Sequence, residues 1–226
     1  MDINLSYIEK GSGFPLILLH GNGEEHSYFE HQIDYFSEFY RVIAIDTRGH
    51  GKSPRGVMPF TISQFADDLY EFVRELRIEK AYILGFSDGG NIALKFALKY
   101  PELVEKLILN GANLDPSGVK KSAQIPIEIG YKIASLFAAK SEAAKRNAEM
   151  LGLMVNDPFI DAESLSEINC ETLVVAGTKD LILGEHSRLI ADRIQKSDLA
   201  FIKGDHFVAA KKPFEFNKIV KEFLDK

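Results

Sequence analysis

The sequence predicts an α/β protein with a mostly parallel, doubly wound sheet. Two observations support this: short continuous apolar runs recur along the chain, and segments with helical periodicity separate them. With 226 residues, of which 46% are hydrophobic, the chain has enough apolar material for one substantial core. We therefore expect a single domain over residues 1–226.

The expected strands are apolar on both faces and rich in Ile, Val and Leu, which is typical of a sheet covered on both sides. A further strand-like segment, 3–8, begins the chain. The apolar runs are Leu16–Leu19, Val42–Ile45, Ala81–Leu84, Leu107–Leu109, Thr172–Ala176 and Leu199–Ile202.

Three further segments have apolar residues at helical spacing, two of them between these runs and one after the last run. Residues 62–76 form an amphipathic pattern that Thr61 or Ser63 would cap. Residues 91–99 are apolar almost all round and end before Pro101, so we expect a buried helix there. Residues 214–224 follow a proline and predict a closing helix.

Residues 112–168 interrupt the alternation, because they contain no convincing strand. They predict two helices, 125–140 and 142–155, forming a lid over the sheet edge where ligands bind in open α/β folds. The alternative is that these helices complete the core. The apolar side chains expected to form a substrate-pocket wall are Phe137, Met150, Met154 and Phe159.

The segment Gly85-Phe-Ser-Asp-Gly89 matches G-x-S-x-G between an expected strand and an expected helix. This context suits a sharp turn that exposes a serine hydroxyl, with glycines allowing the strand and helix backbones to approach. Ser87 is therefore the candidate nucleophile. A structural turn serine is the alternative.

A serine nucleophile needs a base and an acid that orients the base. Of six histidines, His206 follows the last expected strand and so lies at the same sheet edge as Ser87, whereas His186 is interpreted as a surface residue. Asp180 follows the preceding strand and is the expected acid. Asp115 is its rival, and Asp205 is too close to the histidine in sequence to orient its ring.

The tetrahedral intermediate of acyl transfer needs hydrogen-bond donors for its oxyanion. We expect the backbone N–H of Asp88, next to the serine, and that of Asn22, in the glycine-containing loop 20–23. His20 is interpreted as a brace for this loop.

Five segments together resemble the α/β-hydrolase superfamily and occur in its order: 18–23, 46–53, 85–90, 177–180 and 204–206. The resemblance implies a sheet opened by an antiparallel hairpin and a cap after the sixth strand. It leaves the lid unmatched, and the family's first strand is missing or very short here. The 46–53 segment is interpreted as a loop organiser.

These features predict a serine hydrolase that cleaves a small carboxylic ester, a thioester, or an aminoacyl ester or amide, through an acyl-enzyme on Ser87. The Asp88 carboxylate would hold a cationic substrate group, as the resemblance to amino-acid-ester hydrolases with Ser-Asp-Gly-Gly implies. A solvated or helix-capping Asp88 is the alternative. Two other functions stay open: a lyase using the same Ser–His pair, although related synthases have arginine where Asn91 stands, and a ligand-binding receptor.

The composition of the chain limits the kinds of partner that we expect it to bind. The net charge of −6 and the lack of a basic run disfavour nucleic acid. Cys170 is the only cysteine, so an internal disulfide and a cysteine metal cluster are excluded. No signal peptide or membrane span is expected, which favours a cytoplasmic protein with a small-molecule substrate. The proposed chemistry requires no cofactor or metal, and the sequence does not indicate an oligomeric state.

Overall fold

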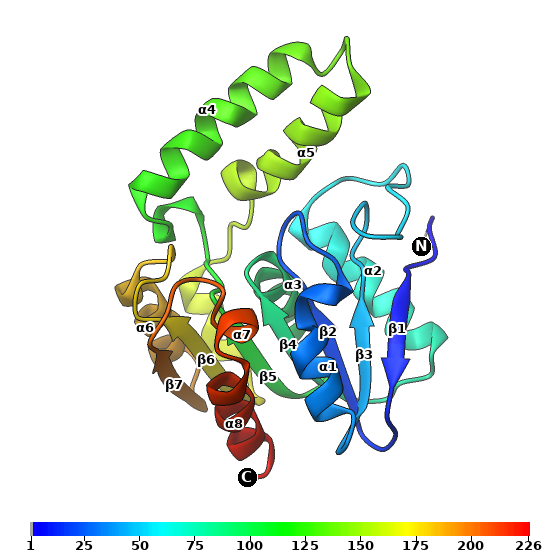
Figure 1. Ribbon diagram of the computed structural model, residues 1–226, viewed down its shortest axis with the longest axis vertical. Coiled ribbons are helices and arrows are strands. Elements are labelled where there is room, and N and C mark those ends of the chain that lie inside the picture. Colours follow the sequence, from blue (N-terminus) through cyan, green and yellow to red (C-terminus); the bar gives the residue numbers. More distant parts are fainter. Residues whose placement is uncertain (1) are drawn as a thin grey trace.

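A computed structural model describes residues 2–226. Its centre is a seven-stranded sheet in the order β1-β3-β2-β4-β5-β6-β7, in which only β1 runs antiparallel to its neighbour, β3 (Figure 1). The strands are β1 (Tyr7–Lys10), β2 (Pro15–Leu19), β3 (Arg41–Ile45), β4 (Ala81–Phe86), β5 (Val104–Asn110), β6 (Glu171–Gly177) and β7 (Ser197–Ile202).

Six of these strands contain the apolar runs that predict them, and the runs in β2 to β6 are largely buried, whereas in the run of the edge strand β7 only Ile202 is buried. The first strand differs from the expected 3–8 segment and begins at Tyr7, where pairing with Ile45 of β3 starts. Ile3 and Leu5 are buried but lie before the strand. The sheet thus opens with one antiparallel strand instead of the hairpin implied by the resemblance.

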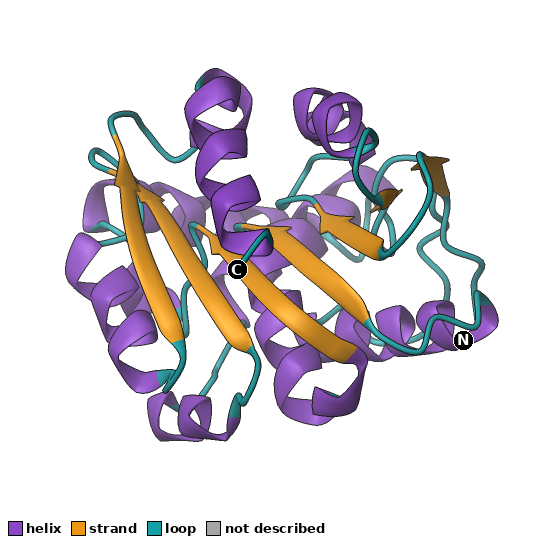
Figure 2. Ribbon diagram, turned by 90° about the horizontal axis from the view of Figure 1, so that it is seen from below, coloured by secondary structure: helices purple, strands orange, loops and turns teal. Residues whose placement is uncertain are grey.

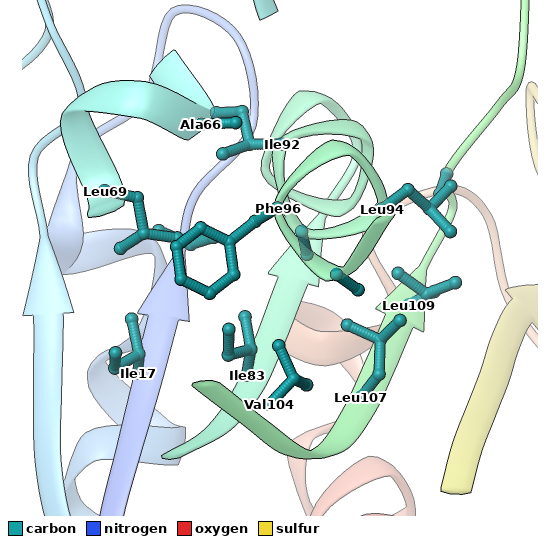
Figure 3. Packing of buried hydrophobic residues seen from close by; sticks show 14 of the residues in the cluster. Ile17, Ala66, Leu69, Ile83, Ile92, Leu94, Phe96, Val104, Leu107 and Leu109 are labelled. Atoms are coloured by element: carbon teal, nitrogen blue, oxygen red, sulfur yellow. The ribbon is translucent and has the colours of Figure 1, made fainter. Parts of the chain in front are cut away.

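Helices cover both faces of the sheet (Figure 2). On one face, α2, α3 and α6 pack against a buried cluster that includes Ile17, Ile83, Phe96 and Leu109 (Figure 3). On the other face, α1, α7 and α8 bury side chains such as Phe36. These helices are α1 (Glu30–Phe36), α2 (Ile62–Glu75), α3 (Asp88–Lys99), α6 (Gly184–Arg193), α7 (Val208–Lys211) and α8 (Pro213–Leu224).

The segment between β5 and β6 contains a hairpin of two helices, α4 (Lys121–Phe137) and α5 (Glu142–Asn156), which stands above the carboxyl edge of the sheet (Figure 1). Ser141 caps α5 by accepting the N–H of Ala144 at 3.3 Å. The hairpin lies in the region between β5 and β6 where the sequence predicts two helices. No helix within residues 2–226 is both long and apolar enough to cross a membrane.

Four short 3₁₀ helices complete the structure. They are His26–Phe29, Pro101–Leu103, Pro116–Gly118 and Ala162–Glu167.

Candidate active site

The connection between β4 and α3 is a tight turn with Ser87 at its tip. Ser87 has a φ of 52° and a ψ of −119°, a conformation that a residue with a side chain adopts only when its surroundings impose it. Its N–H donates to the carbonyl of Asn110 on β5 at 2.8 Å, and its carbonyl accepts the N–H of Gly90 at 2.8 Å. The neighbouring strand and the first turn of α3 therefore hold the strained residue in place.

Close backbone approach explains the two glycines of this turn. A Cβ on Gly85 would overlap the backbone of Gly89. A Cβ on Gly89 would overlap the carbonyl of Leu19 at the end of β2. Glycine at both positions lets α3 begin directly against the carboxyl edge of the sheet, so that Ser87 lies at that edge.

Asp180 and His206 form a buried pair at the same edge. Nδ1 of His206 lies 2.6 Å from Oδ1 of Asp180, and the two residues are 4% and 2% exposed. Because a carboxylate only accepts, the proton of this bond belongs to Nδ1, and Nε2 is left as the basic nitrogen. Asp180 also accepts the N–H groups of Ile182 at 2.9 Å and Gly177 at 3.1 Å.

The Asp180 carboxylate is stabilised in its charged form. Burial acts to raise its pKa, but the hydrogen bond and charge of His206 and the two backbone N–H groups outweigh burial and hold the pKa below its usual value. Asp180 is therefore ionised at neutral pH and orients the His206 ring.

Ser87 and His206 both line one cavity of about 150 Å³. Within residues 2–226, no hydrogen bond joins the Ser87 hydroxyl to the His206 ring. Such bonds are commonly long in unliganded hydrolases and shorten when substrate binds. The cavity size favours a small substrate in this conformation.

The cavity lies beneath the open end of the helical hairpin, where α4 begins and α5 ends. Of the predicted substrate-binding residues, Asp88 and Met154 line it. Phe137, at the closed tip of the hairpin, and Phe159 are 54% and 66% exposed and lie outside its wall. Met150, one helical turn before Met154, lines a separate hollow instead. The full wall consists of Asn22, Glu24, Phe86, Ser87, Asp88, Asn113, Val119, Gln124, Ile127, Met154, Asp157, Leu181, Ile182, His206 and Phe207.

Asp88 is 6% exposed, and its two carboxylate oxygens differ. Oδ1 accepts from the side chain of Asn91 at 3.2 Å, whereas Oδ2 has no partner within the described residues. Burial raises the pKa of Asp88 to about 6, although the amides of Asn22 and Asn91 act to lower it. Asp88 is therefore an underbonded acid in the cavity wall beside Ser87.

Two further acids in the cavity wall were not anticipated from the sequence. Burial raises the pKa of Glu24 to about 7, against the lowering effect of the Gly21 N–H and of His206. Burial also raises the pKa of Asp157. Glu24 follows the loop 20–23 directly, which is the one sequence signal for its position. Asp157 follows the last turn of α5 and gives no comparable signal.

The loop 20–23 is braced from below, as expected of His20. The His20 ring donates through Nδ1 to the carbonyl of Gly21 at 2.7 Å and accepts the N–H of Thr47 at 3.0 Å. Burial lowers the pKa of His20 to about 4, so the ring is neutral and can donate and accept at once.

The expected oxyanion donors are both available. Within residues 2–226, neither the backbone N–H of Asn22 nor that of Asp88 has a hydrogen-bond acceptor. Both residues line the cavity that Ser87 enters. A tetrahedral oxyanion is the kind of group that two such N–H donors stabilise.

The other two acids considered for the catalytic site bind other groups. Asp115 caps a short helix by accepting the N–H of Ser117 at 2.7 Å, and Asp205 pairs with Lys211. The interpretation of His186 as a surface residue is wrong: it is 8% exposed and its Nε2 accepts the N–H of Leu114 at 2.9 Å. This ring satisfies a buried amide of the loop after β5, which sequence spacing does not indicate.

The 46–53 segment organises loops, as the sequence predicts. Asp46 accepts the backbone N–H groups of His26 at 2.8 Å and Lys52 at 3.0 Å. Arg48 is fully buried and forms a bidentate pair with Asp68 of α2, with both distances 2.7 Å. These bonds tie the loops after β2 and β3 to α2.

This architecture and site define an α/β-hydrolase. The family model described as alpha/beta hydrolase fold matches residues 15–131, and the chain belongs to this family. It is 30% identical to a putative carbamate hydrolase RutD of Rhizobium rhizogenes, over 99% of this chain and 97% of that relative. It is 29% identical to the human serine hydrolase BPHL, over 98% and 83% of the two chains.

A solved structure of a hydrolase from Pseudomonas aeruginosa PA01 superposes with a TM-score of 0.79. The two chains are 25% identical, and the match covers 99% of this chain and 95% of that one.

Proposed function

We propose that this α/β-hydrolase cleaves a small carboxylic ester, thioester or amide through an acyl-enzyme on Ser87. The observation that supports the proposal is the convergence of a strained Ser87 and the hydrogen-bonded Asp180–His206 pair on one cavity. Three parts of the chain that are distant in sequence supply these groups, in the order known for this type of triad.

In the proposed reaction, Nε2 of His206 removes the proton of the Ser87 hydroxyl as Oγ attacks the substrate carbonyl. Asp180 stabilises the imidazolium that results. The C–O, C–S or C–N bond to the leaving group then breaks, and His206 returns the proton to that group. Water, deprotonated by the same ring, attacks the acyl-enzyme and releases the acid and the free Ser87.

The backbone N–H groups of Asn22 and Asp88 would bind the oxyanion of both tetrahedral intermediates. Loss of one such donor in a comparable site costs about 10²–10³ in kcat. Two such donors would therefore provide a large part of the reduction in the activation free energy.

The finer substrate proposal is an ester or amide whose acyl group carries a cationic amine. The buried Asp88 with an unpartnered Oδ2 supports it, because a buried carboxylate without a partner is costly unless a cation pairs with it. Glu24 and Asp157 lie in the same wall, and because burial raises the pKa of each, a nearby cation would favour their charged forms. The substrate amine would then lie between Asp88 and the scissile carbonyl.

A fluorophosphonate probe tests the nucleophile. We expect it to label the wild-type protein at one equivalent and to leave Ser87→Ala unlabelled. Turnover of an activated short-chain ester would accompany labelling. Labelling without turnover would indicate a binding protein or a lyase on this fold, and no labelling would refute the proposal.

Paired esters test the substrate class. Asp88→Asn should lower kcat/KM for an aminoacyl ester and leave kcat/KM for the matching neutral acyl ester nearly unchanged. Equal losses on the two esters would remove the cationic substrate and keep the hydrolase.

A further inference from the structure

The helical hairpin is joined to the loop 20–23 by a side-chain hydrogen bond. Nδ2 of Asn22 donates to the backbone carbonyl of Met150, in the middle of α5, at 2.8 Å. The two residues are 128 positions apart in the chain. Asn22 thus lines the cavity and also contacts α5 through its side chain.

The same turn of α5 is held from a second direction. Glu149, the neighbour of Met150, accepts two hydrogen bonds from Arg55, with Nε–Oε2 at 2.9 Å and Nη2–Oε1 at 2.7 Å. Arg55 is itself fixed by the carbonyl of Met58 at 2.8 Å and lies over the ring of Phe60 at 4.8 Å. A two-point guanidinium–carboxylate pair sets orientation as well as distance.

On the loop side, the body of the protein holds the peptide that joins Gly21 to Asn22 by its carbonyl. The Gly21 carbonyl accepts from Nδ1 of His20 at 2.7 Å and from the N–H of Glu24 at 3.3 Å, and the Gly21 N–H donates to the Glu24 carboxylate at 3.2 Å. The next residue, Gly23, has a φ of 76° and open space around its Cα. The bond from the Asn22 side chain to α5 is therefore a second anchor of the peptide whose N–H is the proposed donor, in addition to the bonds that its carbonyl accepts.

We propose that Asn22 is a positioning residue and that the α5 turn 149–150 forms the outer support of the oxyanion hole. This inference rests on the proposed hydrolase function. Seating of α5 on Arg55 completes the support of the Asn22 N–H, and displacement of α5 leaves this peptide held by its carbonyl alone. Lid position and oxyanion binding are one coupled event.

The proposal predicts which kinetic constant should change. A donor that acts on the tetrahedral oxygen stabilises the transition state more than the bound substrate, so losing its support lowers kcat and leaves KM nearly unchanged. A lid residue that merely shapes the pocket would change KM instead. The two roles are therefore separable.

The test compares Asn22→Ala, which keeps the backbone N–H, with Glu149→Ala, which removes the Arg55 pair outside the cavity. Glu142→Ala is the matched control, because it removes an exposed carboxylate from the first turn of the same helix. The measurements are kcat and KM for a neutral activated ester, and Ki for phenylboronic acid, which forms a tetrahedral adduct with Ser87.

Each test variant should lower kcat by roughly two- to ten-fold, the effect of one hydrogen bond, and raise Ki by the same factor with KM unchanged. The control should match the wild type. Asn22→Ala combined with Glu149→Ala should lose less than the product of the single losses, because both break one linkage.

Unchanged kcat and Ki in Glu149→Ala and Asn22→Ala, with Ser87 still labelled at one equivalent by a fluorophosphonate, would overturn the inference and leave the hydrolase standing. A wild-type protein that is not labelled would overturn the hydrolase first. If thermal unfolding shows that Glu149→Ala does not fold, Asn22→Ala decides alone, and an equal rise of KM there would also refute the positioning role.

Discussion

Replacement of Asp88 by asparagine should stabilise the protein in a pH-dependent way. Asparagine has nearly the same shape as aspartate but is uncharged, so it places no charge in a site that is 6% exposed. Burial raises the pKa of Asp88 from 3.8 to about 6. Since one decade in a proton-binding constant is about 1.4 kcal/mol, the charged carboxylate costs the folded protein about 3 kcal/mol above pH 6.

The direction of this pH dependence follows from proton binding. Between pH 3.8 and about 6 the folded protein binds this proton more tightly than the unfolded chain does, so the contribution of Asp88 to stability falls as the pH rises through that window. The stabilisation by Asp88→Asn should therefore grow by about 2 kcal/mol between pH 4.5 and pH 7.5.

Urea unfolding of both proteins at pH 4.5, 6 and 7.5 measures this difference directly. Asp192→Asn is the control, because Asp192 is exposed on α6 and stays in water in the folded protein. A gain from Asp88→Asn that is constant across the three pH values would refute the assignment of a buried charge to Asp88. The same variant should lose activity on cationic esters, so stability and substrate selection would change in opposite directions.

Three other substitutions test the catalytic pair and the scaffold. Asp180→Asn should lower kcat by about 10⁴, because the His206 ring loses its oriented tautomer; a loss of less than ten-fold in steady-state turnover would exclude this role. Asp68→Ala should destabilise the protein by about 3 kcal/mol or more in urea unfolding, since it leaves the buried Arg48 without its bidentate partner. Thr61→Ala should cost about 1 kcal/mol in the same assay, because the Thr61 side chain accepts the N–H of Gln64 in the first turn of α2 at 3.2 Å; no change would mean that the cap contributes nothing.

The sheet could be predicted from sequence because its central parallel strands are buried on both faces and so appear as continuous apolar runs. The run 172–176 lies wholly inside β6, and 199–202 inside β7. The edge strand β1 gave a poorer prediction because all four of its residues are exposed. The apolar residues that suggested an earlier start, Ile3 and Leu5, fill the core from a non-strand segment.

The catalytic candidates were predictable because parallel strands all end at one edge, so residues after successive strands meet there. Asp180 and His206 follow β6 and β7, and the structure brings them within 2.6 Å. The cavity wall was not predictable in this way. Whether Met150 or Met154 reaches the cavity depends on how far along α5 the cavity lies, and helical periodicity places both on similar faces.

The site therefore has two parts with different mechanical support. Ser87, Asp180 and His206 are fixed by the sheet, and the strain at Ser87 is held by bonds to β5 and α3. The substrate side depends on a hairpin that meets the body through polar contacts of α5 and through Leu153, which is buried in the core. Because the nucleophile is useful only when the oxyanion donors are equally well placed, the contact from α5 to Asn22 makes the proposed oxyanion hole depend on the position of the hairpin. A hydrolase built in this way would react fastest with substrates that keep α5 seated, and the acyl group would be selected in the catalytic step as well as in binding.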